Sequence, residues 1–153
     1  MRGQSAVEYL VIFSTVMLIL GGVTIAQMVT PASRSADDAL HLSQARGAVD
    51  AIAGAINTVY SNGPGAVKSV GFQMDVGWVL GLDNGNDKVW IAVTTSRGAE
   101  NIRENLRYDF ENGFYAACPS GHWTVVVEWA ERENMRVVNE NRTIYISIKP
   151  RGR

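Results

Sequence analysis

The chain has 153 residues, a formal net charge of −1 at pH 7 and a pI of about 6.1. This length accommodates one membrane-spanning segment and one small globular domain, and the near-neutral charge gives no electrostatic case for binding nucleic acid. The single cysteine, Cys118, excludes an internal disulfide and a zinc site of paired cysteines, and we expect it to be a small buried residue.

A long apolar segment begins just after the N-terminus. Between Tyr9 and Ser33 the sequence contains no Asp, Glu, Lys, Arg or His, and residues 10–26 are almost wholly apolar. As a helix, this segment is long enough to cross about 30 Å of hydrocarbon. Glu8 lies at its edge, where an unpaired carboxylate is costly and usually has a partner. The pattern predicts a transmembrane helix over residues 4–30.

The N-terminus lacks two features of an ordinary secretory signal. Its basic part is only Met1 and Arg2, and no Ala-x-Ala cleavage site follows the apolar segment. The nearest candidate site, residues 29–33, is made poor by Pro31. We therefore expect the apolar segment to remain in the mature protein. The positive terminal amine and Arg2 favour a cytoplasmic N-terminus.

Residues 2–10, Arg-Gly-Gln-Ser-Ala-Val-Glu-Tyr-Leu, resemble the class III signal peptide of archaeal type IV pilin-like proteins. In that family a basic residue and a glycine precede a glutamine, a glutamate stands at the fifth mature position, and a tyrosine often follows it. The resemblance implies a leader of residues 1–3 that a prepilin peptidase cuts between Gly3 and Gln4. Bacterial Tad-type pilins carry a similar pattern, so the motif does not decide between an archaeal and a bacterial origin.

The resemblance also implies a function. It implies that the chain is a structural subunit of an archaeal type IV pilus-like surface filament. The subunit would polymerise through its hydrophobic N-terminal helix, and the filament would serve surface adhesion. The implied partners are other copies of the chain, the prepilin peptidase, a pilus assembly ATPase with its membrane platform protein, and the membrane before assembly. No cofactor and no metal are implied. Before assembly the protein would be a single-pass membrane protein, and afterwards an extracellular filament.

Gln4, Glu8 and Tyr9 are the predicted assembly residues. Cleavage after Gly3 creates an amine on Gln4, one helical turn before Glu8, and the amine of an incoming subunit can meet Glu8 of a subunit already packed. Removing one partner of a buried ion pair costs about 3–5 kcal/mol, although the intact pair adds little stability. The pair therefore sets the axial register of the subunits. In the alternative interpretation, Glu8 lies in the headgroup zone and faces water.

Three positions weaken the predicted helix, namely Gly21, Gly22 and Pro31. They permit a bend where the segment leaves the membrane. The alternative is two separate helices joined at residues 30–35, with Ser35 as the N-cap of the second.

An amphipathic helix is expected over residues 31–61. Its apolar residues are spaced by three and four positions and form one narrow stripe. The stripe comprises Leu42, Ala45, Val49, Ile52, Ile56 and Val59. We expect it to pack on the protein's own sheet, in preference to forming a coiled-coil seam. His41, among polar neighbours, is expected to be solvated.

Residues 62–150 are predicted to form a β-rich outer domain. Asn62-Gly63-Pro64-Gly65 ends the helix, after which apolar residues alternate in short runs bounded by turn residues. This pattern is typical of an antiparallel sheet or a β-sandwich. Residues 99–110 also fit a short helix, but a strand is favoured. The fold class expected is α+β, a long N-terminal helix followed by an antiparallel β-sheet or β-sandwich domain.

The β-rich domain offers only weak candidate sites. Residues 83–87 lack the downstream bidentate acid of a calcium loop and predict a hairpin turn. Cys118 and His122 are not expected to form a nucleophilic pair, and Glu128 is expected to be solvated. Asn141 begins an N-glycosylation sequon.

No convergent polar cluster is evident, so we expect no catalytic residues and no enzyme activity. The alternative to the filament is a bitopic membrane-tethered extracellular binding domain that does not polymerise. A membrane-anchored enzyme is the third hypothesis.

Overall fold

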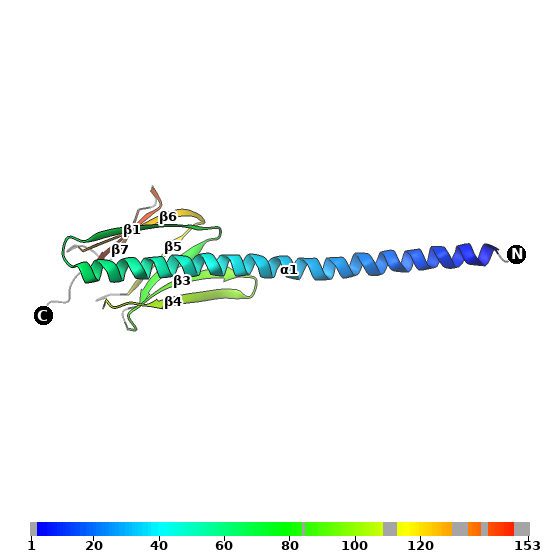
Figure 1. Ribbon diagram of the computed structural model, residues 1–153, viewed down its shortest axis with the longest axis horizontal. Helices are drawn as coiled ribbons and strands as arrows, with labels where there is room; N and C mark the ends of the chain where they lie inside the picture. The colour runs from blue at the N-terminus through cyan, green and yellow to red at the C-terminus, as the bar shows by residue number, and fades with distance from the viewer. Residues whose placement is uncertain (1–2, 84, 109–112, 130–134, 139–140, 149–153) are drawn as a thin grey trace. The chain divides into compact units, whose positions relative to one another are not determined.

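The structure is a computed structural model that describes residues 3–83, 85–108, 113–129, 135–138 and 141–148. Within these ranges it describes the side chains except those of residues 3–5, 26–31, 114 and 135–138. It consists of one helix followed by eight strands (Figure 1). The α+β class expected from the sequence is therefore confirmed.

The helix α1 runs from Gly3 to Asn62 without interruption. It continues through Gly21, Gly22 and Pro31, although a proline inside a helix removes one backbone hydrogen bond and its ring clashes with a carbonyl one turn back. The alternative of two separate helices joined at residues 30–35 is therefore wrong for this structure. Ser35 lies inside α1 and is not an N-cap. Whether the three positions bend the helix in a membrane or filament stays a prediction.

The chain divides into two compact units, Met1–Asp37 and Asp38–Arg153. The boundary lies inside α1, so the C-terminal part of the helix belongs with the strands. A β-rich domain beginning at residue 62 was expected from the sequence. The described strands lie within residues 62–150, and the second unit also includes residues 38–61 of α1, whose apolar stripe supplies one layer of its core.

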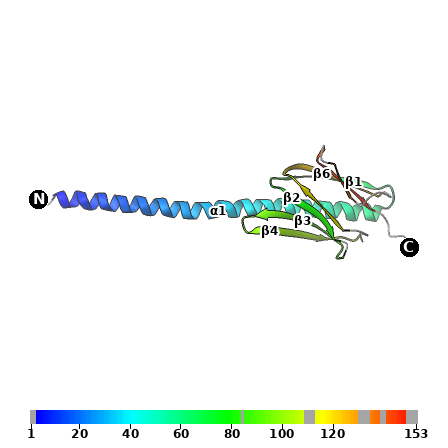
Figure 2. The same cartoon turned by 180° about the vertical axis from the view of Figure 1, so that it is seen from behind.

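The strands of the second unit form two four-stranded sheets, drawn from opposite sides in Figures 1 and 2. The first sheet has the order β1-β6-β8-β7, with bounds β1 Val67–Met74, β6 Gly121–Trp129, β8 Thr143–Ile148 and β7 Met135–Val138. The second sheet has the order β4-β3-β2-β5, with bounds β4 Gly98–Asn105, β3 Lys88–Thr95, β2 Trp78–Asp83 and β5 Phe114–Cys118.

All strand pairs are antiparallel except β6 and β8, which are parallel. The parallel pair arises because β7 forms an antiparallel pair with β8 at the edge of the sheet, which leaves β8 to lie beside β6. The first sheet is therefore mixed. The second sheet is wholly antiparallel in the described strands. The strand favoured over residues 99–110 is present as β4 up to Asn105, residues 106–108 are not in a strand, and residues 109–110 lie outside the described residues.

One core joins α1 to both sheets. The stripe residues of α1 that are at most 1% exposed are Ala45, Val49, Ile52, Ile56 and Val59. They belong to the same apolar cluster as Leu80 and Ile91 of the second sheet and Val125 and Ile146 of the first. In Figure 1, β1 and β6 lie along one side of this part of α1, and β3 and β4 lie along the other. The prediction that the stripe packs on the protein's own sheet is confirmed.

Candidate functional site

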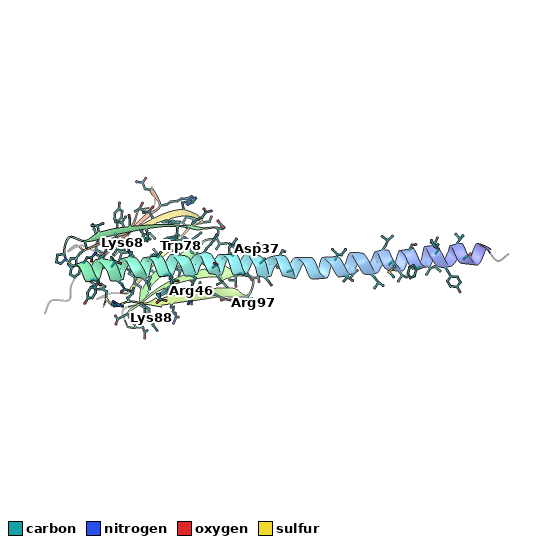
Figure 3. All side chains as sticks on the ribbon, in the orientation of Figure 1. Asp37, Arg46, Lys68, Trp78, Lys88 and Arg97 are labelled. Carbon is teal, nitrogen blue, oxygen red and sulfur yellow. The ribbon has the colours of Figure 1, made fainter. Side chains whose placement is uncertain are left out.

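The surface of α1 from Ala6 to Ile25, here called the apolar segment, is uncovered. It has 20 residues and a mean hydropathy of 2.0, and none of it is buried in the described structure. Its side chains project around the helix in Figure 3. The large apolar side chains that are 47–77% exposed are Val7, Tyr9, Leu10, Val11, Ile12, Phe13, Val16, Met17, Leu18, Ile19, Leu20, Val23 and Ile25. An apolar surface of this extent is normally covered by lipid or by protein.

The serine and threonine hydroxyl groups of the apolar segment are satisfied within the helix itself. Ser14 Oγ donates to the Leu10 carbonyl at 2.7 Å, Thr15 Oγ1 to the Val11 carbonyl at 2.9 Å, and Thr24 Oγ1 to the Leu20 carbonyl at 2.6 Å. Because each donor already has an acceptor one turn back, these residues need no water. These three positions are therefore compatible with an apolar environment.

Glu8 is the one charged side chain in the apolar segment. It is exposed, as is Tyr9, which is 75% exposed. Gln4 lies four residues earlier in the same helix, a spacing that places the two residues on one face a single turn apart. The helix thus carries an uncovered apolar surface with one carboxylate near its start. The roles of Gln4, Glu8 and Tyr9 in assembly stay predictions.

The predicted cleavage site lies at the very start of the described helix. Gly3 is the first residue of α1, and Gln4 is the second. Met1 and Arg2 of the predicted leader lie outside the described residues. Cleavage at this bond would leave the whole apolar segment in the mature chain.

Two polar contacts between α1 and turns of the β-rich unit were not foreseen from the sequence. Asp38 accepts hydrogen bonds from the backbone N–H of Ser96, at 2.8 Å, and from the Ser96 hydroxyl. These two bonds lower the pKa of Asp38, the side-chain bond most. The partners are 58 positions apart, so no local pattern could have indicated the contact. Asp38 ties the turn between β3 and β4 to the helix.

The second contact joins Gln44 to Asp75 in the turn between β1 and β2. Gln44 Nε2 donates to Asp75 Oδ2 at 2.6 Å, and the Asp75 backbone N–H donates to Gln44 Oε1 at 3.1 Å. Gln73 Nε2 donates to the other carboxylate oxygen at 2.9 Å. The bond from Gln44, followed by that from Gln73, lowers the pKa of Asp75. These amide–carboxylate bonds are structural links in an exposed region.

The cysteine is buried, as expected. Cys118 is 4% exposed, and burial raises the pKa of its thiol to about 11. A thiol with so high a pKa is a poor nucleophile near neutral pH because the thiolate is the reactive form. His122, four residues on, is exposed on β6.

Asp83 of β2 pairs with Lys88 of β3, so the chain makes the hairpin that the sequence predicted between these two residues, of which Asn84 lies outside the described residues. Asp83 accepts hydrogen bonds from Asn86 Nδ2 at 2.9 Å and from the Gly85 N–H at 3.0 Å, which together lower its pKa. Its carboxylate is therefore engaged in the turn. Among the described residues no group of three or more His, Cys, Asp or Glu side chains is placed to hold a metal ion.

Two polar side chains are less solvated than the sequence suggested. Glu128 is half-buried, and Ser147 Oγ donates to its carboxylate at 3.3 Å. His41 is half-buried on α1. Both lie beside strands or turns that are distant in sequence, which the local pattern did not reveal.

Asn141 of the sequon is exposed just before β8. Thr143, the third sequon residue, donates from its hydroxyl to the Asn141 carbonyl at 3.1 Å. An exposed asparagine is accessible to a modifying enzyme. Glycosylation at Asn141 stays a prediction.

Comparison of the chain with family models, with curated proteins and with solved structures finds no match. An apolar N-terminal helix of this length is a feature of membrane anchors and also of signal sequences. Any finer functional conclusion must come from the residues of the apolar segment and those that flank it.

Proposed function

We propose that the protein is the structural subunit of an extracellular, type IV pilus-like filament, and that it polymerises through the apolar segment of α1 after removal of residues 1–3. The observation that carries the proposal is the exposure of the whole apolar segment, Ala6–Ile25. Such a surface must be shielded from water. Lipid would shield it before assembly, and other copies of the helix would shield it in the filament.

Glu8 favours assembly over simple anchoring. A helix that only anchors a domain gains nothing from a carboxylate at the edge of its apolar segment, because burying that charge is costly. In a bundle of identical helices the same carboxylate can meet the Gln4 amine of a neighbouring copy. The favourable burial of apolar side chains then supplies the stability, and the ion pair fixes how far each subunit slides along its neighbours.

The β-rich unit supplies the outer, solvent-facing part of the proposed filament. Its buried apolar residues pack against one another in one core, to which α1 and both sheets contribute. The unit therefore does not need polymerisation in order to bury its apolar core. Adhesion to a surface is the role that the resemblance of residues 2–10 implies for such a filament.

The decisive experiment compares Glu8→Gln with Asp37→Asn in cells that make the protein. Both substitutions neutralise one exposed carboxylate on α1, but Asp37 lies outside the apolar segment. We expect Glu8→Gln to insert in the membrane normally and to be lost from sheared surface filaments. The expected penalty is about 3–5 kcal/mol per subunit, since the partner amine is left buried and unpaired.

Asp37→Asn should assemble as the unchanged protein does. Normal filaments from Glu8→Gln would refute the register role of Glu8. A protein that stays monomeric in the membrane, with its first three residues uncut, would instead support the tethered binding domain.

A further inference from the structure

The second sheet has an outer face that no described residue covers. Along β3 the side chains of Val89, Ile91, Val93 and Thr95 enter the core, so the alternating positions point outward. The strand register extends this alternation to the other three strands. The outward positions are Tyr115 and Ala117 on β5; Val79 and Gly81 on β2; Lys88, Trp90, Ala92 and Thr94 on β3; and Ala99, Asn101, Arg103 and Asn105 on β4. This set is called the outer face below.

An aromatic row crosses the outer face. The strand register places Tyr115, Gly81, Trp90 and Arg103 directly beside one another on β5, β2, β3 and β4. Tyr115 is 77% exposed, and Trp90 is half-buried. Since adjacent strands are about 4.8 Å apart, the row presents two aromatic residues within two strand spacings. Two linked sugar rings can cover such a span.

Gly81 makes the row flat. A Cβ atom on Gly81 would lie 2.1 Å from Cε2 and 2.2 Å from Cζ2 of the Trp90 indole. The indole therefore lies directly over the glycine, and it remains partly open to solvent. Beside it is a shallow hollow of about 430 Å³, which Val79, Ala92 and Ala117 help to line. Small side chains keep this surface open to a ligand.

The described outer face carries two cations, Lys88 and Arg103, and one acid, Asp83. Lys88 and Arg103 flank Trp90, the first along its own strand and the second directly opposite on β4. Figure 3 labels Lys88. Glu100 and Glu104 occupy the alternate positions of β4 and face the other way. Asp83, at the end of β2, also occupies an outward position, directly opposite Lys88 on β3. Hydrogen bonds from Asn86 and Gly85, and to a smaller extent the charge of Arg103, lower the pKa of Asp83, so two positive charges and one negative charge lie together at this end of the face.

We propose that the outer face of the β4-β3-β2-β5 sheet binds an acidic polysaccharide, one that carries carboxylates or sulfates on its sugar rings. The apolar face of a ring stacks on the indole of Trp90, which is large, rigid and apolar. The anionic group pairs with Arg103, whose planar guanidinium can donate two parallel hydrogen bonds. Asn101 and Asn105, both exposed on the same strand, supply donors and acceptors for the hydroxyl groups.

A single-stranded nucleic acid also offers rings and negative charge, but this face suits it less. Proteins that bind single strands use a basic groove that follows many phosphates. Here the cations are confined to Lys88 and Arg103 within the described part of the face, and the whole chain has a net charge of −1. The inference uses only residues of the Asp38–Arg153 unit, so it stands whether or not the chain polymerises.

The test is a binding titration of the full-length protein in a polyoxyethylene detergent, which has no sugar headgroup to compete. The probes are polygalacturonate oligomers, the matched neutral galactose oligomers, and a single-stranded DNA oligomer of equal charge. The variants are Trp90→Ala, Arg103→Gln and Gly81→Ala, the last of which displaces the indole without removing it. Arg46→Gln, which removes an exposed arginine of α1, is the matched control. Near-ultraviolet circular dichroism confirms that each variant is folded.

We expect the acidic oligomer to bind more tightly than the neutral one, with an affinity that falls as salt is added. Arg103→Gln and Trp90→Ala should each weaken it by about tenfold, the value of one good polar or stacking contact, while Arg46→Gln should not. Gly81→Ala should weaken binding with the indole still present. No binding, equal binding of the neutral oligomer, tighter binding of DNA, or equal effects of Arg103→Gln and Arg46→Gln would each overturn the proposal.

Discussion

The Ile52→Ala substitution gives a direct measure of how firmly α1 is built into the β-rich unit. Ile52 is fully buried in the core that joins the helix to both sheets. The change removes three carbon atoms, and at about 0.8 kcal/mol per buried carbon the lost transfer energy is about 2.4 kcal/mol. The residual cavity adds to this, so the expected loss of stability is about 2.5–4 kcal/mol, within the range for such truncations.

Leu40→Ala is the matched control because it removes the same three carbons from the same helix. Leu40 is 51% exposed, so about half of its transfer energy is lost and no closed cavity is left. The expected cost is about 1 kcal/mol. The control therefore separates the effect of burial from any effect of composition or helix propensity.

Urea unfolding in detergent, followed by tryptophan fluorescence, measures both effects. Trp78 and Trp123 are each 2% exposed, and their rings pack edge to face with centroids 5.7 Å apart. Their emission therefore reports the state of the core. With a slope of about 2 kcal/mol per molar urea, Ile52→Ala should lower the midpoint by more than 1 M. Equal shifts for the two variants would refute the idea that α1 and the sheets share one core.

Two further predictions concern titratable groups in the β-rich unit. Hydrogen bonds from Gln44 and Gln73 lower the pKa of Asp75 in the folded protein, so its stabilising effect is complete above the ordinary value of 3.8 and is lost as the pH falls through the depressed folded value. Stability should therefore decline below about pH 4, and in Asp75→Asn this part of the decline should be smaller; an unchanged acid profile in that variant would contradict the assignment. The pKa of Cys118 is raised to about 11 by burial, so maleimide should label this thiol only after unfolding, and rapid labelling of the folded protein would show that the thiol is accessible.

The local pattern of the sequence predicted most of the fold, because burial imposes a period on each element. The stripe from Ala45 to Val59 is buried where the spacing of three and four residues placed it. The turn at residues 83–87 joins two strands, as its cluster of polar residues and glycine indicated. These features depend on residues close together in the chain.

Features that depend on distant residues were not predicted. The parallel pairing of β6 with β8 follows from the position of β7 at the edge, which no periodicity encodes. The bond between Gln44 and Asp75 joins positions 31 residues apart. The placement of the Trp90 indole over Gly81 depends on the register of β2 against β3. Each of these contacts is fixed by strand order and register, and these are properties of the assembled fold.

The apolar segment and the C-terminal part of α1 differ in one physical respect. In residues 45–59 the apolar side chains of the stripe are at most 1% exposed, since two sheets cover them. In Ala6–Ile25 no described residue covers them. The first part is covered within the described chain, whereas the second is not.

The most direct test of the central claim is the mass of the N-terminal peptide in filaments sheared from the surface of native cells. If the apolar segment is the polymerisation helix of a processed subunit, the filaments contain this chain and its first residue is Gln4. A chain that is found only in the membrane fraction, and that begins at Met1, would contradict the proposed function.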